Sequence, residues 1–468
     1  MVFSSHIFVF CFLPLLLLVY YNLPYRARNA FLALMSYGFY AWWKPWFASL
    51  MLTTTLVNYL CGQAIAAPGA SRRRRVGALV VACSVSLGLL GFFKYYTFSV
   101  ESLNSLLALF GTGALPVLRV TLPIGISFFT FHALTYTVDL YRGDARPVRS
   151  FADFACFISM FPQLVAGPIL RYHTVADQLA WREHTASRFA SGTALFILGF
   201  AKKVLLANPM GEVADAAFGA AAPVALDAWA GALAYAFQIY FDFCGYSDMA
   251  VGLGRMVGFE FPKNFDAPYR AESITDLWRR WHVSLSTFLR DYLYIPLGGN
   301  RKGAARTYTN LAIVMLLGGL WHGAQWTFVA WGAYHGALLA YERWRGKTSL
   351  YHRLPRPCRI AFTFVLMLFS WVLFRSESLS AAGHYFAAML GLGAGGGSGL
   401  LVAAELYAPK HMLLMGICAA LVFQPIQAFD WIQRPMSLRR VALLLPLFVL
   451  SLAAMATQAF NPFLYFQF

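Results

Sequence analysis

Long apolar runs separated by short polar loops recur along this chain and constrain its fold more than any other feature. Each run is close to the roughly 20 residues that a helix needs to cross the hydrocarbon core of a bilayer. Inside lipid, backbone N–H and C=O groups must be paired within the protein, which a helix achieves by itself. We expect crossings at about residues 7–22, 29–43, 46–62, 76–97, 122–140, 190–207, 228–259, 311–331, 360–374, 411–429 and 441–458. The sequence therefore predicts an all-α, polytopic membrane protein with about eleven transmembrane helices.

The composition supports a membrane protein and disfavours several other classes. Hydrophobic residues make up 59% of the 468 residues and charged residues 12%, whereas a soluble protein carries about 25% charged residues. The formal net charge is +17, but the basic residues lie between apolar runs. We interpret them as topology signals and as contacts for membrane lipids, and expect no nucleic-acid partner. The seven cysteines show no CxxC and no metal-ligand spacing, so we expect neither a disulfide framework nor a bound metal.

The distribution of basic loops predicts the orientation of the chain. The loops after the first, third and fifth runs are basic, and Arg72–Arg75 is the most strongly charged segment. Positively charged loops stay on the cytoplasmic side of a membrane. The N-terminus is therefore expected outside, and the basic loop near residues 434–440 places the C-terminus outside as well.

Three stretches do not fit a simple crossing. Residues 151–170 are apolar, but Pro162 and Pro168 interrupt helical bonding, so we expect a re-entrant or interfacial segment. Residues 272–294 separate apolar from charged side chains at helical spacing, which predicts an amphipathic helix in the interface or in a protein-lined groove. Residues 391–399 are rich in glycine, which is typical of a flexible connector.

Polar side chains also lie within the long apolar run that begins near residue 228. Gln238 and Asp242 are four residues apart, so they share one face of a helix. One interpretation is that this face forms the polar wall of an internal tunnel. The other is that Asp242 and Asp248 each form a structural ion pair with an arginine such as Arg255 or Arg279. The sequence leaves both interpretations open.

The run at residues 311–331 carries a histidine, His322, with Gly318, Gly319 and Gly323 beside it. An ionisable group at membrane depth is costly and is usually retained for function. Glycines weaken a helix by about 1 kcal/mol each and favour kinks. Broken helices are tolerated in membranes where the backbone lines a cavity in the protein. We therefore predict a histidine at a helix break that faces an internal cavity.

Common catalytic motifs are absent, since the sequence contains no P-loop, no dinucleotide-binding glycine motif, no GxSxG and no HExxH. His322 and His282 remain as candidates for chemistry because both lie in tryptophan-rich segments. The tryptophans beside them are interpreted as packing and tunnel wall: Trp278, Trp281, Trp321 and Trp326. His132 and His335 lie in apolar runs, and we expect both to be hydrogen-bonded core histidines.

Several motifs resemble those of the membrane-bound O-acyltransferase (MBOAT) family. They are Trp278-Arg-Arg-Trp-His282, Leu289-Arg-Asp-Tyr292, Leu297-Gly-Gly-Asn-Arg301, Leu316-Leu-Gly-Gly-Leu-Trp-His-Gly323, Leu122-Pro-Ile-Gly-Ile-Ser-Phe128 and Tyr240-Phe-Asp-Phe243. In particular they are similar to membrane subunits of the bacterial branch that acetylates exopolysaccharides. The resemblance implies a single membrane domain over residues 1–468, with a motif-rich part at 1–375 and divergent C-terminal helices at 376–468.

The resemblance also implies a function. Helices would surround a central tunnel in the bacterial inner membrane, with both termini in the periplasm, and the chain would transfer acetyl groups for O-acetylation of alginate or cellulose. Acetyl-CoA is the expected donor, as a substrate and not as a bound cofactor. Expected partners are periplasmic acetyltransferase or acetyl-carrier proteins and the polysaccharide secretion complex. The family's near-invariant histidine falls on His322, and the second histidine position of this branch falls on His282.

The chemistry of these residue types agrees with that expectation. Acetyl transfer requires removal of a hydroxyl proton, and a neutral imidazole can accept it near pH 7. A covalent acetyl-histidine is the other open route. His282 either orients the substrate, holds the carbonyl oxygen or makes a structural hydrogen bond. Two alternatives to an enzyme are a polysaccharide or lipid transporter and a non-catalytic subunit of a secretion complex.

Overall fold

A computed structural model describes residues 1–346, 353–393 and 399–458. These residues form helices and connecting segments without any strand, which confirms the all-α prediction for the described part of the chain. Two compact units can be distinguished. The first comprises Met1–Thr193 and Ala250–Pro262, and the second comprises Ala194–Met249 and Lys263–Phe468.

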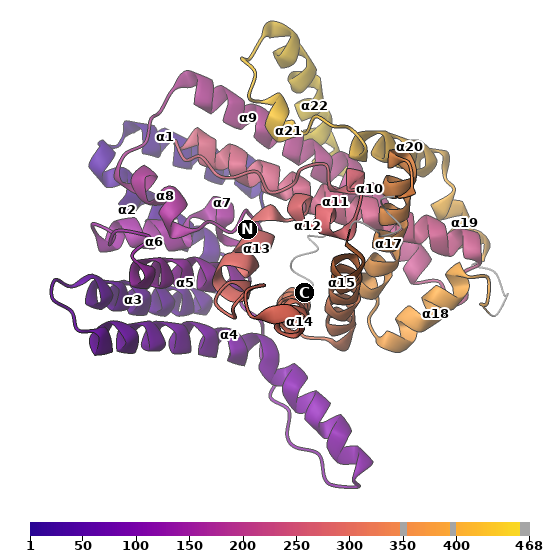
Figure 1. Cartoon of the computed structure of the whole chain (residues 1–468). Coiled ribbons are helices and arrows are strands. Elements are labelled where there is room, and N and C mark those ends of the chain that lie inside the picture. The colour runs from indigo at the N-terminus through magenta and orange to yellow at the C-terminus, as the bar shows by residue number, and fades with distance from the viewer. Residues whose placement is uncertain (347–352, 394–398, 459–468) are drawn as a thin grey trace. The chain divides into compact units, whose positions relative to one another are not determined.

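The first unit is built from helices joined by loops of different lengths. After a π-helical turn at Phe8–Phe12 come α1 (Leu13–Asn22), α2 (Arg28–Ala41), α3 (Trp46–Ala66), α4 (Arg72–Leu109), α5 (Ile126–Arg142), α6 (Phe151–Ser159), α7 (Phe161–Leu164) and α8 (Tyr172–Ala180). Helices α3, α4 and α5 lie side by side (Figure 1). A side chain at Gly62 of α3 would collide with the Tyr136 ring of α5, so glycine permits this close packing.

Two helices contribute to both units. They are α9 (Ala186–Ala201) and α11 (Ala225–Met256). Helix α9 continues through a π-helical segment at Lys202–Ala207 into α10 (Asn208–Phe218), so that one helical rod covers Ala186–Phe218.

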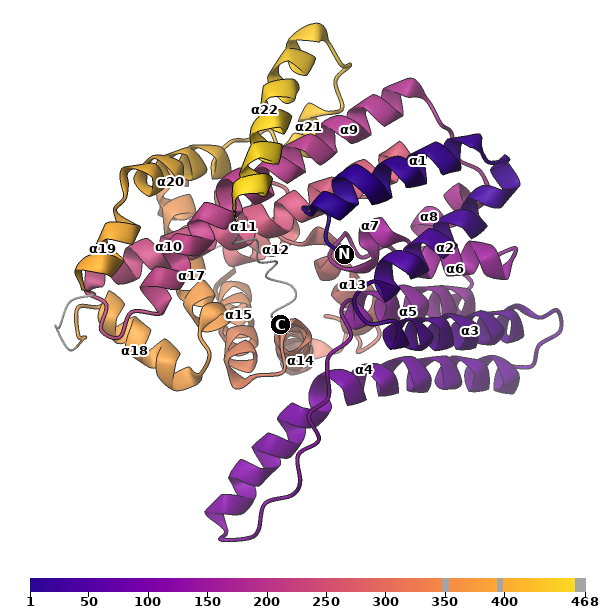
Figure 2. The same cartoon turned by 180° about the vertical axis from the view of Figure 1, so that it is seen from behind.

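The second unit contains most of the remaining helices (Figure 2). They are α12 (Ile274–Arg280), α13 (Val283–Leu289), α14 (Gly303–His322), α15 (Trp326–Arg345), α17 (Arg356–Arg375), α18 (Leu379–Met389), α19 (Leu400–Leu406), α20 (Pro409–Val422), α21 (Ala428–Trp431) and α22 (Leu438–Thr457). The core of this unit is unusually aromatic, and the indoles of Trp281, Trp331 and Trp371 are at most 3% exposed.

Apolar helices of membrane-spanning length are present in the described chain. Four of them are long and apolar enough to cross a bilayer: Arg72–Leu109, Ala186–Phe218, Arg356–Arg375 and Leu438–Thr457. They correspond to four of the predicted runs, and the total of eleven stays a prediction. Helix α4 has 38 residues and is about 57 Å long at 1.5 Å per residue, well beyond the ~30 Å hydrocarbon core.

Two predicted segments each consist of more than one helix. The run at residues 311–331 is not one crossing, because α14 ends at His322 and α15 begins at Trp326, and the two helices lie side by side. The predicted amphipathic helix at residues 272–294 is also interrupted. It consists of α12, α13 and a π-helical end at Arg290–Tyr294.

The stretch at residues 151–170 is interrupted as predicted, and its re-entrant or interfacial position stays a prediction. It contains two short helices, α6 and α7, that meet at Met160. At nine and four residues both are far too short to cross a bilayer. In the glycine-rich segment predicted as a connector, residues 394–398 lie outside the described residues.

Candidate active site

His322 is the last residue of α14 and is only 8% exposed. The backbone becomes extended at Gly323, and α15 begins three residues later at Trp326. A side chain at Gly323 would collide with the Phe328 ring, so only glycine fits this turn. The predicted helix break is therefore present, and it lies directly after the histidine.

The other glycines act differently from the prediction. A Cβ on Gly319 would collide with the backbone carbonyl oxygen of Phe328, and one on Gly332 would collide with that of Met315. Gly319 lies within helical α14 and Gly332 within helical α15. These glycines therefore allow α14 and α15 to pack closely, and they do not kink α14 as the sequence suggested.

Aromatic rings enclose the imidazole of His322. The ring centroids of Trp321, Trp331 and Phe374 lie 4.9, 5.0 and 5.1 Å from the imidazole centroid, all in edge-to-face orientation. Trp331 comes from α15 and Phe374 from α17, so three helices hold the ring in place. This packing fixes the imidazole in a largely apolar environment.

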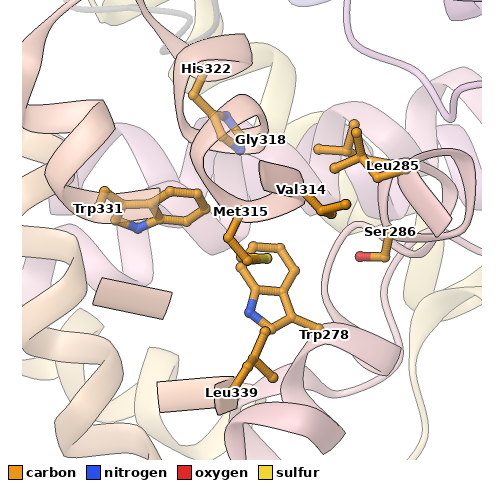
Figure 3. Close-up of a pocket in the computed structure, with 10 residues that line it drawn as sticks. Trp278, Leu285, Ser286, Val314, Met315, Gly318, His322, Trp331 and Leu339 are labelled. Carbon is orange, nitrogen blue, oxygen red and sulfur yellow. The ribbon is translucent and has the colours of Figure 1, made fainter. Parts of the chain in front are cut away.

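A cavity of about 120 Å³ lies beside the imidazole. Its wall is almost wholly apolar and consists of Trp278, Leu285, Ser286, Leu289, Val314, Met315, Gly318, His322, Trp331 and Leu339. Figure 3 shows the imidazole of His322 directed toward the interior of this group, with Trp331 and Met315 on the neighbouring walls. His322 therefore faces a small, partly open apolar cavity, whereas an enclosed tunnel to either membrane face stays a prediction.

His282 occupies a strained turn between α12 and α13. It is fully buried, and its φ of +43° lies in the left-handed region that non-glycine residues seldom adopt. Its Nδ1 lies 3.1 Å from the side-chain oxygen of Asn264. Burial lowers the pKa of His282 to about 3, because an apolar environment disfavours the charged imidazolium. The ring is therefore neutral at physiological pH.

The two predicted histidines meet at one tryptophan. The imidazole centroid of His282 lies 5.8 Å from the Trp321 ring, and that of His322 lies 4.9 Å from the same ring. The structure therefore brings together two histidines that are forty residues apart in the sequence. Two other predicted tryptophans lie in different places. Trp278 lines the cavity, whereas Trp281 packs against Trp371 in the core.

The sequence allows two interpretations of the polar residues in α11. Gln238 and Asp242 form the polar wall of a tunnel, or Asp242 and Asp248 each form a structural ion pair. The structure pairs Asp242 with Lys203 and Asp248 with Lys202, each at 2.6 Å. The ion-pair interpretation therefore holds in the structure, with lysines in place of the suggested arginines. Gln238 is buried in α11. Among the residues that the structure describes, the ten that line the His322 cavity include neither Gln238 nor Asp242.

Sequence reasoning missed several residues of this region. Asn264, which contacts His282, lies in a polar loop that carries no motif. Phe374, which packs on His322, looked like one more apolar residue of a crossing helix. His335 was expected to be a hydrogen-bonded core histidine, but neither of its buried ring nitrogens has a hydrogen-bond partner in the described chain. His132 does match that expectation, since its Nε2 accepts a hydrogen bond from the backbone N–H of Leu170.

One group of side chains has the composition of a metal site. Ligand atoms of Glu212, Glu405 and His411 lie within 4.8 Å of one another. Lys410 lies 3.9 Å from the same Glu212 carboxylate, which supplies positive charge there. None of these residues lines the His322 cavity as the structure describes it.

Comparison with known proteins identifies the family. The model of the membrane-bound O-acyltransferase family matches residues 144–376, a segment that contains both His282 and His322. A probable alginate O-acetylase of Azotobacter vinelandii is 44% identical over 501 residues, and one of Pseudomonas putida is 45% identical over 490 residues; both alignments cover 100% of each chain. A peptidoglycan O-acetyltransferase of Helicobacter pylori is 35% identical, covering 84% of this chain and 80% of the relative.

These matches agree with the structural observations, namely apolar helices of spanning length and a buried histidine beside an apolar cavity. The chain belongs to the membrane-bound O-acyltransferase family and is an O-acyltransferase.

Proposed function

We propose that this chain transfers an acetyl group from cytoplasmic acetyl-CoA across the bacterial inner membrane for O-acetylation of a secreted exopolysaccharide. The observation that carries the proposal is the position of His322, buried at the end of α14 with its ring facing an apolar cavity. The full-length likeness to two probable alginate O-acetylases supports the reaction class and favours alginate over cellulose as the polymer. In this proposal both units form one membrane domain with about eleven crossings and periplasmic termini.

His322 acts as the general base in the proposed reaction. The imidazole removes the proton of the acceptor hydroxyl while the hydroxyl oxygen attacks the thioester carbonyl. The tetrahedral intermediate then collapses, the carbon–sulfur bond breaks, and the thiolate of coenzyme A leaves with the proton that the imidazole returns. Such general-base assistance contributes roughly 10²–10⁴ in rate. The C-terminal end of α14, which carries the negative end of the helix dipole, stabilises the imidazolium that forms transiently.

The size of the cavity supports a short acyl group. Its volume of about 120 Å³ is well below the roughly 300–1,000 Å³ of pockets that hold drug-sized ligands. The apolar wall suits a methyl group. A long fatty acyl chain would have to extend beyond this space.

The acetyl group would then reach the polymer with the help of periplasmic acetyltransferase or acetyl-carrier proteins and the secretion complex. The membrane subunit supplies the crossing step, because acetyl-CoA is cytoplasmic and the polymer is secreted. This arrangement explains why a soluble acetyltransferase alone would not suffice.

Replacing His322 with alanine tests this proposal against its alternatives. In a polymer-secreting strain that depends on this chain, His322→Ala should abolish polymer O-acetylation, while the protein stays in the membrane and polymer export continues. The matched control is His384→Ala, because His384 is an exposed histidine of α18, and it should acetylate normally. Loss of export would instead indicate a transporter. Full acetylation by the His322→Ala chain would refute the proposed mechanism and favour a non-catalytic role.

A further inference from the structure

The side chain of Asn264 makes several polar contacts with the turn that carries His282. The Asn264 Oδ1 lies 3.1 Å from His282 Nδ1, 3.2 Å from the backbone nitrogen of Ser284 and 2.8 Å from the Ser284 hydroxyl oxygen. The backbone of Asn264 also takes part, because its carbonyl oxygen accepts a hydrogen bond from the N–H of Val283. Asn264 and Ser284 are at most 5% exposed, so water does not compete for these contacts.

The contacts fix the orientation of the Asn264 amide. A backbone N–H can only donate a hydrogen bond, so the Asn264 atom that faces the Ser284 nitrogen must be the oxygen. The same oxygen faces His282 Nδ1, and a carbonyl oxygen can only accept. His282 Nδ1 must therefore carry the hydrogen.

A second contact of His282 agrees with this assignment. The Ser284 hydroxyl oxygen lies 3.3 Å from His282 Nδ1 and only 2.8 Å from Asn264 Oδ1, so its one hydrogen is directed to the nearer amide oxygen. If Nδ1 instead carried a lone pair, two acceptors would face each other at 3.1 Å, and burial would make this repulsion costly.

It follows that Nε2 of neutral His282 carries a lone pair. This atom is buried and has no hydrogen-bond partner in the described chain, which is costly unless a ligand or a water molecule supplies a donor. An Nε2 atom with a lone pair cannot donate a hydrogen bond to the carbonyl oxygen of a thioester, since that oxygen is itself an acceptor. It can accept a hydrogen bond from an O–H group. Of the roles open to His282 from the sequence, the structure thus favours orienting the acceptor.

We propose that Asn264 is a positioning residue that locks the tautomer of His282, so that His282 Nε2 binds a hydroxyl group of the acetyl acceptor. This inference rests on the proposed function. Strain agrees with a functional role, because left-handed backbone at a non-glycine residue costs of order 1–3 kcal/mol and persists mainly where the surroundings enforce it.

Two substitutions of Asn264 separate positioning from packing. Asn264→Leu keeps the size of the side chain but removes the oxygen that faces His282 Nδ1. Either ring nitrogen of His282 can then carry the hydrogen. Asn264→Asp keeps an acceptor for both the His282 and the Ser284 donors. In membranes of the polymer-secreting strain, which retain the partner proteins, and with acetyl-CoA supplied, we expect Asn264→Leu to lower kcat for polymer acetylation by at least about tenfold, with the KM for acetyl-CoA unchanged. Asn264→Asp should retain activity within a few-fold.

Coupling to His282 distinguishes the inference from a loss of folding. If Asn264 acts through His282, then Asn264→Leu should cause no further loss in a chain that already carries His282→Gln. Asn310 provides the matched control, because it is also fully buried and donates to the backbone carbonyl oxygen of Gly299 at 2.9 Å. The effect of Asn310→Leu should add to that of His282→Gln. Additive effects of Asn264→Leu and His282→Gln would overturn the inference.

Nitrogen-15 NMR of histidine-labelled protein tests the tautomer without any assay of activity. The signal that disappears in His282→Gln should report a protonated Nδ1 and a bare Nε2. The Asn264→Leu spectrum should lose this pattern. A protonated Nε2 in the unsubstituted chain would refute the inference. If the chain failed to transfer acetyl groups from acetyl-CoA, the proposed function would fall, while this measurement would still decide the role of Asn264.

Discussion

The Nζ of Lys203 lies 2.6 Å from the Oδ1 of Asp242, and both side chains are only 2% exposed. Lys203 lies in the π-helical segment between α9 and α10, and Asp242 lies in α11, so the pair joins two helical rods of the second unit. An isolated buried charge is costly, whereas a buried pair compensates its own charges. The pair therefore compensates two buried charges, and the role of Asp242 in a tunnel wall stays a prediction.

Removing one member of this pair should destabilise the protein strongly. We expect Asp242→Leu to lower the free energy of unfolding by about 3–5 kcal/mol, because Lys203 is left as an uncompensated buried charge. The double variant Lys203→Met/Asp242→Leu should recover most of that loss. Thermal unfolding in detergent, followed by size-exclusion chromatography, measures both effects. A double variant as unstable as Asp242→Leu alone would show that the charge pair is not the cause.

Two adjacent glycines of α14 should respond very differently to the same substitution. Gly319→Ala places a methyl group against the Phe328 carbonyl oxygen, so α15 must move away and carry Trp331 with it. Gly318→Ala meets only the Leu289 Cδ1, at 3.5 Å, which is an ordinary contact. We expect Gly319→Ala to lower the melting temperature of the protein in detergent markedly and Gly318→Ala to leave it nearly unchanged. Equal melting temperatures of the two variants would contradict the packing described for α14 against α15.

A histidine of the first unit should make stability depend on pH. Burial, together with the Arg182 and Arg28 guanidinium groups, lowers the pKa of His184 to about 4, against about 6.5 in an unfolded chain. Between these values the unfolded chain binds more protons than the folded one, so stability is fully present above about pH 6.5 and falls as the pH drops toward 4.

The His184→Gln variant isolates this effect. Its melting temperature in detergent should fall less between pH 7 and pH 4.5 than that of the unsubstituted chain. The physical cause is local, because the Arg28 guanidinium contacts His184 Nδ1 at 3.3 Å and disfavours its protonation. Identical pH profiles for the two chains would show that other groups set the acid sensitivity.

Much of the helical architecture was predictable because a helix that crosses a membrane needs about 20 predominantly apolar residues. Apolar length identified the all-α fold and four of the spanning helices that the structure describes. His322 was predictable at a helix break beside a cavity, because an ionisable residue among glycines in an apolar run is rare without function.

The remaining features depend on tertiary contacts that leave no local signal. The turn at His282 was read as part of one helix, because a left-handed backbone at histidine has no sequence signature of its own. Gly319 was predicted to favour a kink, because the helix that packs against it cannot be seen in a linear pattern. The partner of Asp242 was sought among arginines, although the lysine that pairs with it is 39 positions earlier in the chain.

Enlarging the cavity should change which acyl donor the protein uses. Met315 lines the cavity beside His322, and Met315→Ala removes a side chain that would clash with a longer acyl group. We expect the ratio of kcat/KM for butyryl-CoA to that for acetyl-CoA to rise by about 10-fold or more, since one methylene in an apolar pocket is worth 10–200-fold. Met367→Ala is the matched control, because Met367 is also buried in the second unit but does not line this cavity. Both variants should lose a similar free energy of unfolding, about 2–5 kcal/mol. This loss does not disturb the comparison, because the ratio of kcat/KM for the two donors is independent of the amount of folded protein. If the two variants kept the same donor preference, the acyl group would have to bind somewhere other than beside His322.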